Sequence, residues 1–211
     1  MPELHLEILP PSQKRLWDEF QKKAAFLNDH GYYLAGGSGL ALQLGHRQSV
    51  DFDFFSQQPS LAQATRDWLE EFTHCVARDI GVHTLHCEAD GVKVSFISAY
   101  KYPMVKPALD TEGIRIASLV DIGLMKLLAL THRATLRDYI DLAALIHGPV
   151  ELEKLLGQSK KKYGKDMNEM IFLRALVAFD DVDPEMPVLV DQSLKDSWQR
   201  ILREAVKKIA R

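Results

Sequence analysis

The spacing of apolar residues changes along the chain and divides it into two parts. Up to about residue 117, short apolar runs predict strands, at 32–35, 50–55, 73–79, 82–89 and 92–98. From Ser118 onward apolar residues recur at helical spacing, which predicts helices at 118–132, 135–147, 150–163, 167–179 and 191–210. We therefore expect an α/β (α+β) fold, with a mixed α/β core over 1–117 and a helical region over 118–211 packed on it.

Proline, glycine and polar residues mark further boundaries in the first part. Pro10-Pro11-Ser12 begins a helix predicted over 13–29, a short helix follows the strand at 32–35 and ends at Gly45, and another helix is predicted at 61–72. Ala89-Asp90-Gly91 predicts a hairpin turn. Residues 113–117 are expected to form an edge strand.

Composition limits the class of protein. The 211 residues are 46% hydrophobic and 26% charged, as in ordinary globular proteins, and the net charge of −3 gives no overall attraction to polyanions. No apolar run approaches the ~20 residues of a membrane span, and the N-terminus lacks a signal-peptide pattern. The two cysteines, Cys75 and Cys87, have no metal-like spacing. We expect a cytoplasmic protein without a membrane partner.

A glycine turn gives the first indication of chemistry. Gly36-Gly37-Ser38 follows the apolar run Tyr32-Tyr33-Leu34-Ala35 and begins a short helix. Strand, glycine turn and helix is an arrangement that directs backbone N–H groups at a phosphate. Gly36 and Gly37 would let the backbone approach a triphosphate, and Ser38 would supply a hydroxyl, which is compatible with a simple N-cap.

Two aspartates follow on the next predicted strand. Asp51 and Asp53 alternate with apolar Val50, Phe52 and Phe54, so both carboxylates lie on one face of the strand. Two like charges this close favour a divalent cation, Mg²⁺ or Mn²⁺, held together with substrate phosphates. The alternative is a solvated strand face.

Residues just before this strand are further candidates. Ser49 shares the face of Asp51 and is placed to bond a carboxylate or a phosphate, although a plain loop residue would be equally unsurprising. Arg47 is placed either to pair with Asp51 or contact phosphate, or to form a surface salt bridge.

The first two helices of the second part carry charges in apolar surroundings. Lys126 lies within an apolar helix, so either its stem extends to water or its ammonium group contacts an anion. Arg133 lies two turns along the same face and is either an extension of this positive surface or a helix-end cation. Asp138 and Asp141 share a face of the next helix, and one of them is expected to be only a structural partner for Arg133 or Arg137.

Taken together, these motifs resemble the AbiEii/AbiGii-type nucleotidyltransferases, a branch of the DNA polymerase β-like superfamily. The resemblance covers about residues 31–147 and rests on Gly36-Gly37-Ser38, on His46-Arg47-Gln48-Ser49-Val50-Asp51-Phe52-Asp53, and on a second block that runs from Asp121 through Lys126 and Arg133 to Asp141. It implies a polymerase β-like core with a small mixed sheet. It also implies a Mg²⁺-dependent enzyme that moves a nucleotidyl group from an NTP to an acceptor hydroxyl.

The same resemblance assigns roles to the charged residues. Asp51 and Asp53 would bind the metal, and Lys126 and Arg133 would contact the triphosphate. An acidic residue near position 141 belongs to the active site of the family, with Asp141 the first choice and Asp138 the second. The biological setting would be a toxin of a toxin–antitoxin or abortive infection system, with a cognate antitoxin and with tRNA or a protein as acceptor.

One departure from the pattern leaves a second reading open. Polymerase β-like enzymes commonly carry a third carboxylate on a neighbouring strand, where this chain has Ser95 in Val92-Lys93-Val94-Ser95-Phe96-Ile97. The base would then be Asp138 or Asp141, or it would be absent. If it is absent, the protein is a non-catalytic nucleotide-binding or interaction module of the same fold. The basic run at 160–165 is either solvated charge at a helix end or a contact for an RNA backbone.

Overall fold

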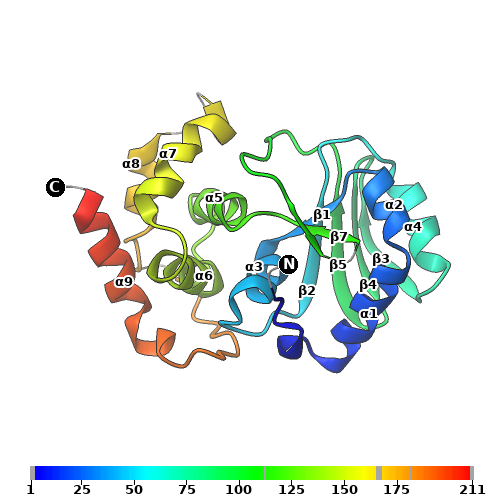
Figure 1. Ribbon diagram of the computed structural model, residues 1–211, viewed down its shortest axis with the longest axis horizontal. Helices are drawn as coiled ribbons and strands as arrows, with labels where there is room; N and C mark the ends of the chain where they lie inside the picture. The colour runs from blue at the N-terminus through cyan, green and yellow to red at the C-terminus, as the bar shows by residue number, and fades with distance from the viewer. Residues whose placement is uncertain (1–2, 112, 165–167, 181, 210–211) are drawn as a thin grey trace.

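A mixed sheet occupies one half of the molecule (Figure 1). The structure is a computed structural model that describes residues 3–111, 113–164, 168–180 and 182–209. Within them, seven strands are arranged in the order β3-β4-β5-β2-β1-β7-β6. Along the chain these strands are β1 (Tyr33–Ala35), β2 (Asp51–Phe55), β3 (Cys75–Ile80), β4 (Thr84–Ala89), β5 (Val92–Ile97), β6 (Leu109–Thr111) and β7 (Ile114–Ile116).

The strand that carries the two aspartates lies at the centre of this sheet. β2 pairs antiparallel with β1 and parallel with β5, and β4 and β5 form the predicted hairpin, with Asp90 and Gly91 at positive φ. The expectation of an edge strand at 113–117 is wrong, because β7 pairs with β1 on one side and with β6 on the other. β6, which the sequence did not indicate, is the edge strand on that side of the sheet.

The predicted helices form, with small changes at their ends. The described helices are η1 (Leu6–Ile8), α1 (Pro11–Lys22), α2 (Ala24–Asp29), α3 (Gly36–Leu44), α4 (Ala62–Glu70), α5 (Leu119–Leu130), α6 (Leu136–His147), α7 (Leu152–Tyr163), α8 (Glu169–Ala175) and α9 (Leu194–Ile209). The helix expected over 13–29 is two helices, because the backbone at Lys23 leaves helical geometry. α8 ends earlier than expected, where the Tyr139 hydroxyl donates to the Ala175 carbonyl at 3.0 Å. Residues 167 and 210, at the ends of two predicted helices, lie outside the described residues.

Alternation along the strands gives the sheet one apolar and one polar face. Phe52 and Phe54 of β2 and Phe96 of β5 are fully or almost fully buried, and they pack with Phe20 of α1 and Trp68 of α4. Helices α1, α2 and α4 cover this face (Figure 1). Successive side chains point to opposite faces, so the odd-numbered residues of β2 point to the other side of the sheet, towards the helical half.

The helical half is joined to the sheet half by α3 and by contacts of buried charged side chains, among them Lys162. α3 packs against β1, β2, α5 and α6, and the buried apolar cluster includes residues of both halves. Lys162 of α7 donates to Asp121 of α5 at 2.8 Å and to the Pro103 carbonyl at 2.9 Å, and its side chain is fully buried. For Lys162, therefore, both expectations for the basic run are wrong: it is neither solvated charge nor a free RNA contact.

The division of the chain at residue 117 stays a prediction. Within the described residues, no helix combines the length and the apolar character needed to cross a membrane.

Candidate active site

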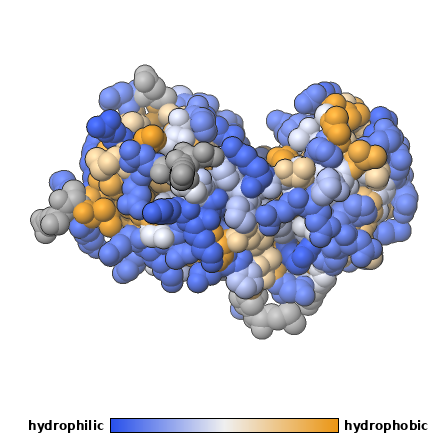
Figure 2. Space-filling view, turned by 90° about the horizontal axis from the view of Figure 1, so that it is seen from above, coloured by the Kyte–Doolittle hydropathy of each residue, from blue (hydrophilic) through white to orange (hydrophobic). Residues whose placement is uncertain are grey.

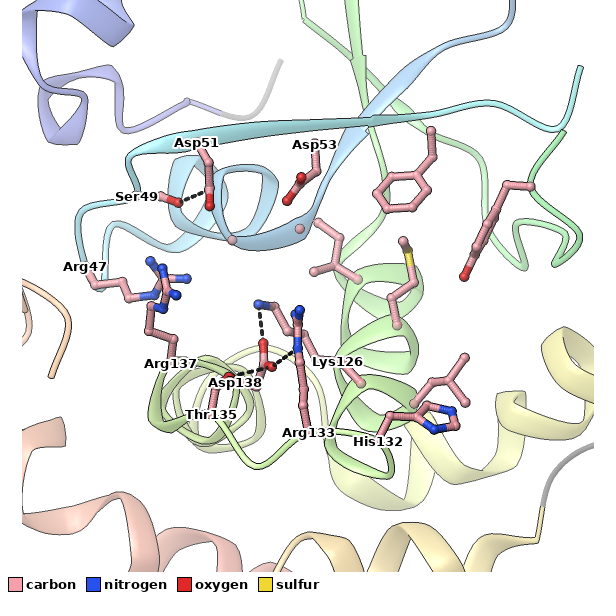
Figure 3. A pocket seen from close by; sticks show the side chains of 18 residues that line it. Arg47, Ser49, Asp51, Asp53, Lys126, His132, Arg133, Thr135, Arg137 and Asp138 are labelled. Carbon is pink, nitrogen blue, oxygen red and sulfur yellow. Dashed lines mark hydrogen bonds and ion pairs between the residues drawn. The ribbon is translucent and has the colours of Figure 1, made fainter. Parts of the chain in front are cut away.

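A pocket of about 490 Å³ lies where the polar face of the sheet meets α5 and α6. Figure 2 shows the surface notched between the helical half and the sheet half, and Figure 3 shows the side chains that line the pocket. The sequence-predicted site residues among them are Gly36, Gly37, Arg47, Ser49, Asp51, Asp53, Lys126, Arg133 and Asp138. Ser38 and Asp141 do not line it.

The sheet side of the pocket is formed by two carboxylates of β2. Asp51 and Asp53 point into the pocket from the same face of the strand, and Ser49 Oγ donates to Asp51 Oδ1 at 3.1 Å (Figure 3). Burial raises the pKa of Asp53, and the neighbouring charge of Asp51 raises it further. A bound cation would therefore stabilise the charged form of Asp53.

The glycine turn packs directly against these carboxylates. Gly36 has φ of +62°, and a Cβ atom at this position would lie 2.5 Å from Asp53 Oδ2. A Cβ atom at Gly37 would lie 2.6 Å from Arg47 Nη2 and 3.0 Å from Ser49 Oγ. Both positions therefore require glycine, one for its backbone conformation and both for space.

We expect Gly36→Ala to reduce metal-dependent nucleotide binding and to destabilise the fold by about 1–3 kcal/mol, because it adds backbone strain and displaces the Asp53 carboxylate. Gly91→Ala is the matched control, since Gly91 has φ of +81° but a Cβ atom there would have no other atom within 4 Å. Denaturant unfolding and calorimetric titration with NTP and Mg²⁺ measure both effects. Equal behaviour of the two variants would contradict a steric role for Gly36.

Ser38 has a different role from the one expected. Its side chain is buried, and its hydroxyl donates to the backbone carbonyl of Asp51, which also accepts from Gln13 Nε2 at 2.9 Å. The hydroxyl therefore points into the protein, away from the pocket, and is committed to β2. Ser38 fixes the strand that carries the carboxylates and offers no phosphate contact in this arrangement.

The helical side of the pocket is cationic and is organised by Asp138. Lys126 Nζ donates to Asp138 Oδ1 at 2.7 Å, Arg133 Nε donates to Asp138 Oδ2 at 3.1 Å, and Thr135 Oγ1 donates to the same oxygen at 2.7 Å. Burial would raise the pKa of Asp138, but Lys126, Thr135 and Arg133 together lower it. The buried ammonium of Lys126 and the largely exposed guanidinium of Arg133 both face the Asp51–Asp53 pair (Figure 3).

Asp141 lies outside the pocket, beneath the side chains of its helical side. It is fully buried and accepts from Arg47 Nε at 2.6 Å, Arg47 Nη2 at 2.8 Å and His46 Nε2 at 2.8 Å, with Lys126 Nζ 2.7 Å from Oδ2. Burial opposes its charge, yet Lys126 and Arg47 hold the pKa of this carboxyl well below its usual range. The placement favours a structural role for Asp141. Of the two aspartates on α6, only Asp138 reaches the pocket.

Comparison with known proteins agrees with this geometry. The family model described as "Nucleotidyl transferase AbiEii toxin, Type IV TA system" matches residues 20–209. The chain belongs to the AbiEii family. An Aquifex aeolicus relative, the uncharacterized protein aq_aa25, is 34% identical over 178 residues, which cover 81% of this chain and 82% of that protein.

A solved structure shows the fold of this AbiEii protein independently. MenT4, the nucleotidyltransferase toxin Rv2826c of Mycobacterium tuberculosis H37Rv, matches with a TM-score of 0.64 and 14% identity, over 93% of this chain and 83% of that chain. The expected family and the expected mixed α/β fold are confirmed.

The carboxylate pair of this AbiEii protein fits a hard divalent cation. Asp51 and Asp53 offer oxygen ligands on one face, which suit Mg²⁺ when substrate phosphates and water complete the coordination. Among the described residues, no cluster of three or more His, Cys, Asp or Glu side chains could hold a metal ion.

Several lining residues were not predicted from the sequence. Phe55 continues the Asp51–Asp53 face of β2, so the same alternation could have identified it. Tyr100 follows β5 in a loop and meets Phe55 with ring centroids 5.1 Å apart. Its position depends on the loop, and neither spacing nor composition indicates it.

Proposed function

We propose that this protein is a Mg²⁺-dependent nucleotidyltransferase that moves a nucleotidyl group from an NTP to an acceptor hydroxyl, on an RNA such as tRNA or on a protein. Its biological role would be that of the toxin in a toxin–antitoxin or abortive infection system, paired with a cognate antitoxin. The family description and the toxin named in the structural comparison support the general class. The details depend on the pocket.

The observation that carries the proposal is the opposition of two charge types across one pocket. Asp51 and Asp53 form one wall, and the cations Lys126, Arg133 and Arg47 lie in or beside the other. A triphosphate with its metal ion has the complementary pattern, since the metal binds carboxylates and the phosphate oxygens bind cations. A neutral substrate would use neither wall fully.

The pocket also has an apolar end that suits a nucleobase. Phe55, Tyr100 and Met125 line it together with Ile122, Leu128 and Ala129. Aromatic side chains offer a stacking surface to any base. The charged end would then bind the phosphates, which places the α-phosphate near Asp51 and Asp53.

Different residues of the pocket would have different roles in the transfer reaction. Asp51 and Asp53 would hold the metal, which when bound neutralises phosphate charge and lowers the barrier at the α-phosphorus. Lys126 and Arg133 would bind the triphosphate in exchange for part of their contact with Asp138. Arg47, fixed by Asp141, keeps a positive charge next to the glycine turn.

A second candidate function is nucleotide binding without transfer. Lys126 and Arg133 occupy Asp138 and lower its pKa, which makes it a poor base, and Ser95 pairs with Asp53 at the strand position where a third carboxylate was expected. These two observations are the grounds for the alternative of a binding module without transfer. A transfer assay paired with a binding measurement distinguishes the two functions.

Incubation with each α-labelled NTP, Mg²⁺ and total tRNA is expected to transfer label to the RNA or to the protein itself, and chelation of the metal should abolish it. Calorimetric titration with the same NTPs is the companion measurement. Binding without transfer would favour the non-catalytic module. Absence of both binding and transfer would overturn the proposed function altogether.

A further inference from the structure

The apolar end of the pocket is bordered by a loop that contacts both halves of the molecule. This loop, residues 98–107, follows β5 and extends towards α5 and α7 (Figure 1). Its Tyr100 is half-buried and lines the pocket. The start of the loop is fixed to the sheet half, because the Tyr100 N–H donates to the Ser56 carbonyl at 2.8 Å.

The ring of Tyr100 is held by other aromatic rings. Its centroid lies 5.1 Å from that of Phe55 and 5.7 Å from that of Tyr102. The ring of Tyr102 in turn meets the buried ring of Tyr163 on α7 edge to face, with centroids 4.7 Å apart. A row of aromatic rings therefore extends from the pocket to the helical half.

The later part of the loop is fixed by a buried ion pair. Asp121 of α5 accepts from the backbone N–H groups of Val105 at 2.9 Å and Lys106 at 3.1 Å. Lys162 of α7 donates both to Asp121 and to the Pro103 carbonyl, and the side chains of the pair are fully buried. The two charges thus satisfy backbone groups on either side of the loop segment that follows Tyr102.

The ion pair acts on the pocket from outside it. Tyr102, Asp121 and Lys162 do not line the pocket, whereas Tyr100 does. Burial of two charges is costly, and here their hydrogen bonds go to the loop, so the pair fixes one loop conformation. A ring that is fixed before a ligand arrives loses little freedom when a nucleobase stacks on it.

We propose that the Asp121–Lys162 pair holds Tyr100 in place as the base-binding side chain of the pocket, so that affinity for an NTP depends on a lysine outside the pocket. Tyr100 would contact the nucleobase, and Asp121 and Lys162 are positioning residues that act through Tyr102. This inference rests on the nucleotide-binding part of the proposed function. Affinity for a triphosphate without a base should not depend on the pair.

The test compares calorimetric titration of each NTP with that of inorganic triphosphate, both with Mg²⁺. Tyr100→Ala should lower affinity for the NTPs by about 5- to 100-fold, as expected for loss of a base–aromatic stack, and leave triphosphate affinity unchanged. Lys162→Met should lower NTP affinity by about 2- to 10-fold, because the loop must then become ordered on binding, and also leave triphosphate affinity unchanged. Lys160→Met, at an exposed position of α7, is the matched control and should change neither affinity.

A second variant covers the effect of Lys162→Met on folding, since this substitution leaves Asp121 buried without its cation. Tyr102→Leu interrupts the row of rings at a half-buried position and changes no charge. It should cause the same selective loss of NTP affinity. Neither substitution should lower NTP affinity further when Tyr100→Ala is already present, because both act through the Tyr100 ring.

The outcomes separate this inference from the proposed function. Unchanged NTP affinity in Tyr102→Leu and in folded Lys162→Met, equal losses of NTP and triphosphate affinity, or additive losses in the combined variants would overturn the inference alone. Equal affinity of the wild type for NTP and triphosphate would do the same. A wild-type protein that binds no NTP would overturn the proposed function and this inference with it.

Discussion

Replacing Asp51 or Asp53 with Asn is expected to lower nucleotidyl transfer by about 10³-fold or more while the protein remains folded. Loss of a metal ligand removes several kcal/mol of transition-state stabilisation, and each 1.4 kcal/mol corresponds to a factor of about ten in rate. Asn keeps the shape of the side chain but removes its charge. Calorimetric titration with NTP and Mg²⁺ and the labelled-nucleotide assay measure the effect.

The stability of these variants follows from the pKa of Asp53. Burial and Asp51 raise this pKa in the folded protein, so ionisation of Asp53 costs stability at pH values above its unfolded pKa. Asp53→Asn removes that cost, and its melting temperature without metal should equal or exceed the wild-type value. Asp110→Asn, at an exposed position of β6, is the control and should change neither quantity. If both site variants retain full transfer activity, the metal assignment is wrong.

The sequence predicted those parts of the site whose geometry depends only on residues close together in the chain. Asp51 and Asp53 were predicted to share a face because strand side chains alternate, and the structure places both in the pocket. The glycine turn was predicted from local sequence too, because it lies between an apolar run and a helical pattern. Its close approach to Asp53 follows from the pairing of β1 with β2, in which Ala35 lies opposite Asp53.

The partners of the buried charges could not be predicted in this way. The i, i+3 spacing places Asp138 and Asp141 on one face of α6, but only the packing of α5, α6 and the 46–48 turn decides which of them reaches the pocket. The sequence allowed Arg47 as a partner for Asp51, yet its guanidinium forms two hydrogen bonds with Asp141. These pairings therefore depend on side chains that are distant in sequence.

Contacts distant in sequence also explain why the prediction of an edge strand at 113–117 was wrong. Residues 113–117 alternate as a strand does, but alternation carries no information about the neighbouring strands. β6 has only three residues, Leu109–Thr111, and the prolines before it made the segment look irregular. The sequence therefore predicted a strand at the correct position with the wrong neighbours.

Lys126→Met is expected to destabilise the fold by about 3–5 kcal/mol, because its ammonium group is paired with buried carboxylates. An isolated buried lysine would be costly, so its removal would leave stability equal or higher. The structure instead gives Lys126 two carboxylate partners, Asp138 and Asp141, each at 2.7 Å. The variant removes one cation from each of the two buried carboxylates. Asp141 then keeps only its contacts with Arg47 and His46, and Asp138 keeps those with Arg133 and Thr135.

The loss should depend on pH with a definite sign. Despite burial, Lys126 keeps the folded-state pKa values of Asp138 and Asp141 below the normal value, so their stabilisation is present above about pH 4 and is lost as the pH falls through the folded pKa values. Without Lys126 these folded pKa values rise. The difference in unfolding free energy between wild type and variant should therefore be largest near pH 7 and should shrink below about pH 4.

Two further variants identify the cause of the destabilisation. Lys154→Met, at an exposed position of α7, should leave stability unchanged. Adding Asp138→Asn to Lys126→Met removes one of the stranded charges and should recover part of the lost free energy, because the two substitutions act on one ion pair. Denaturant unfolding at several pH values measures all four proteins. A Lys126→Met protein as stable as the wild type at pH 7 would show that this ammonium group does not hold α5 and α6 together, and the case for Lys126 as a residue devoted to the triphosphate would then be stronger.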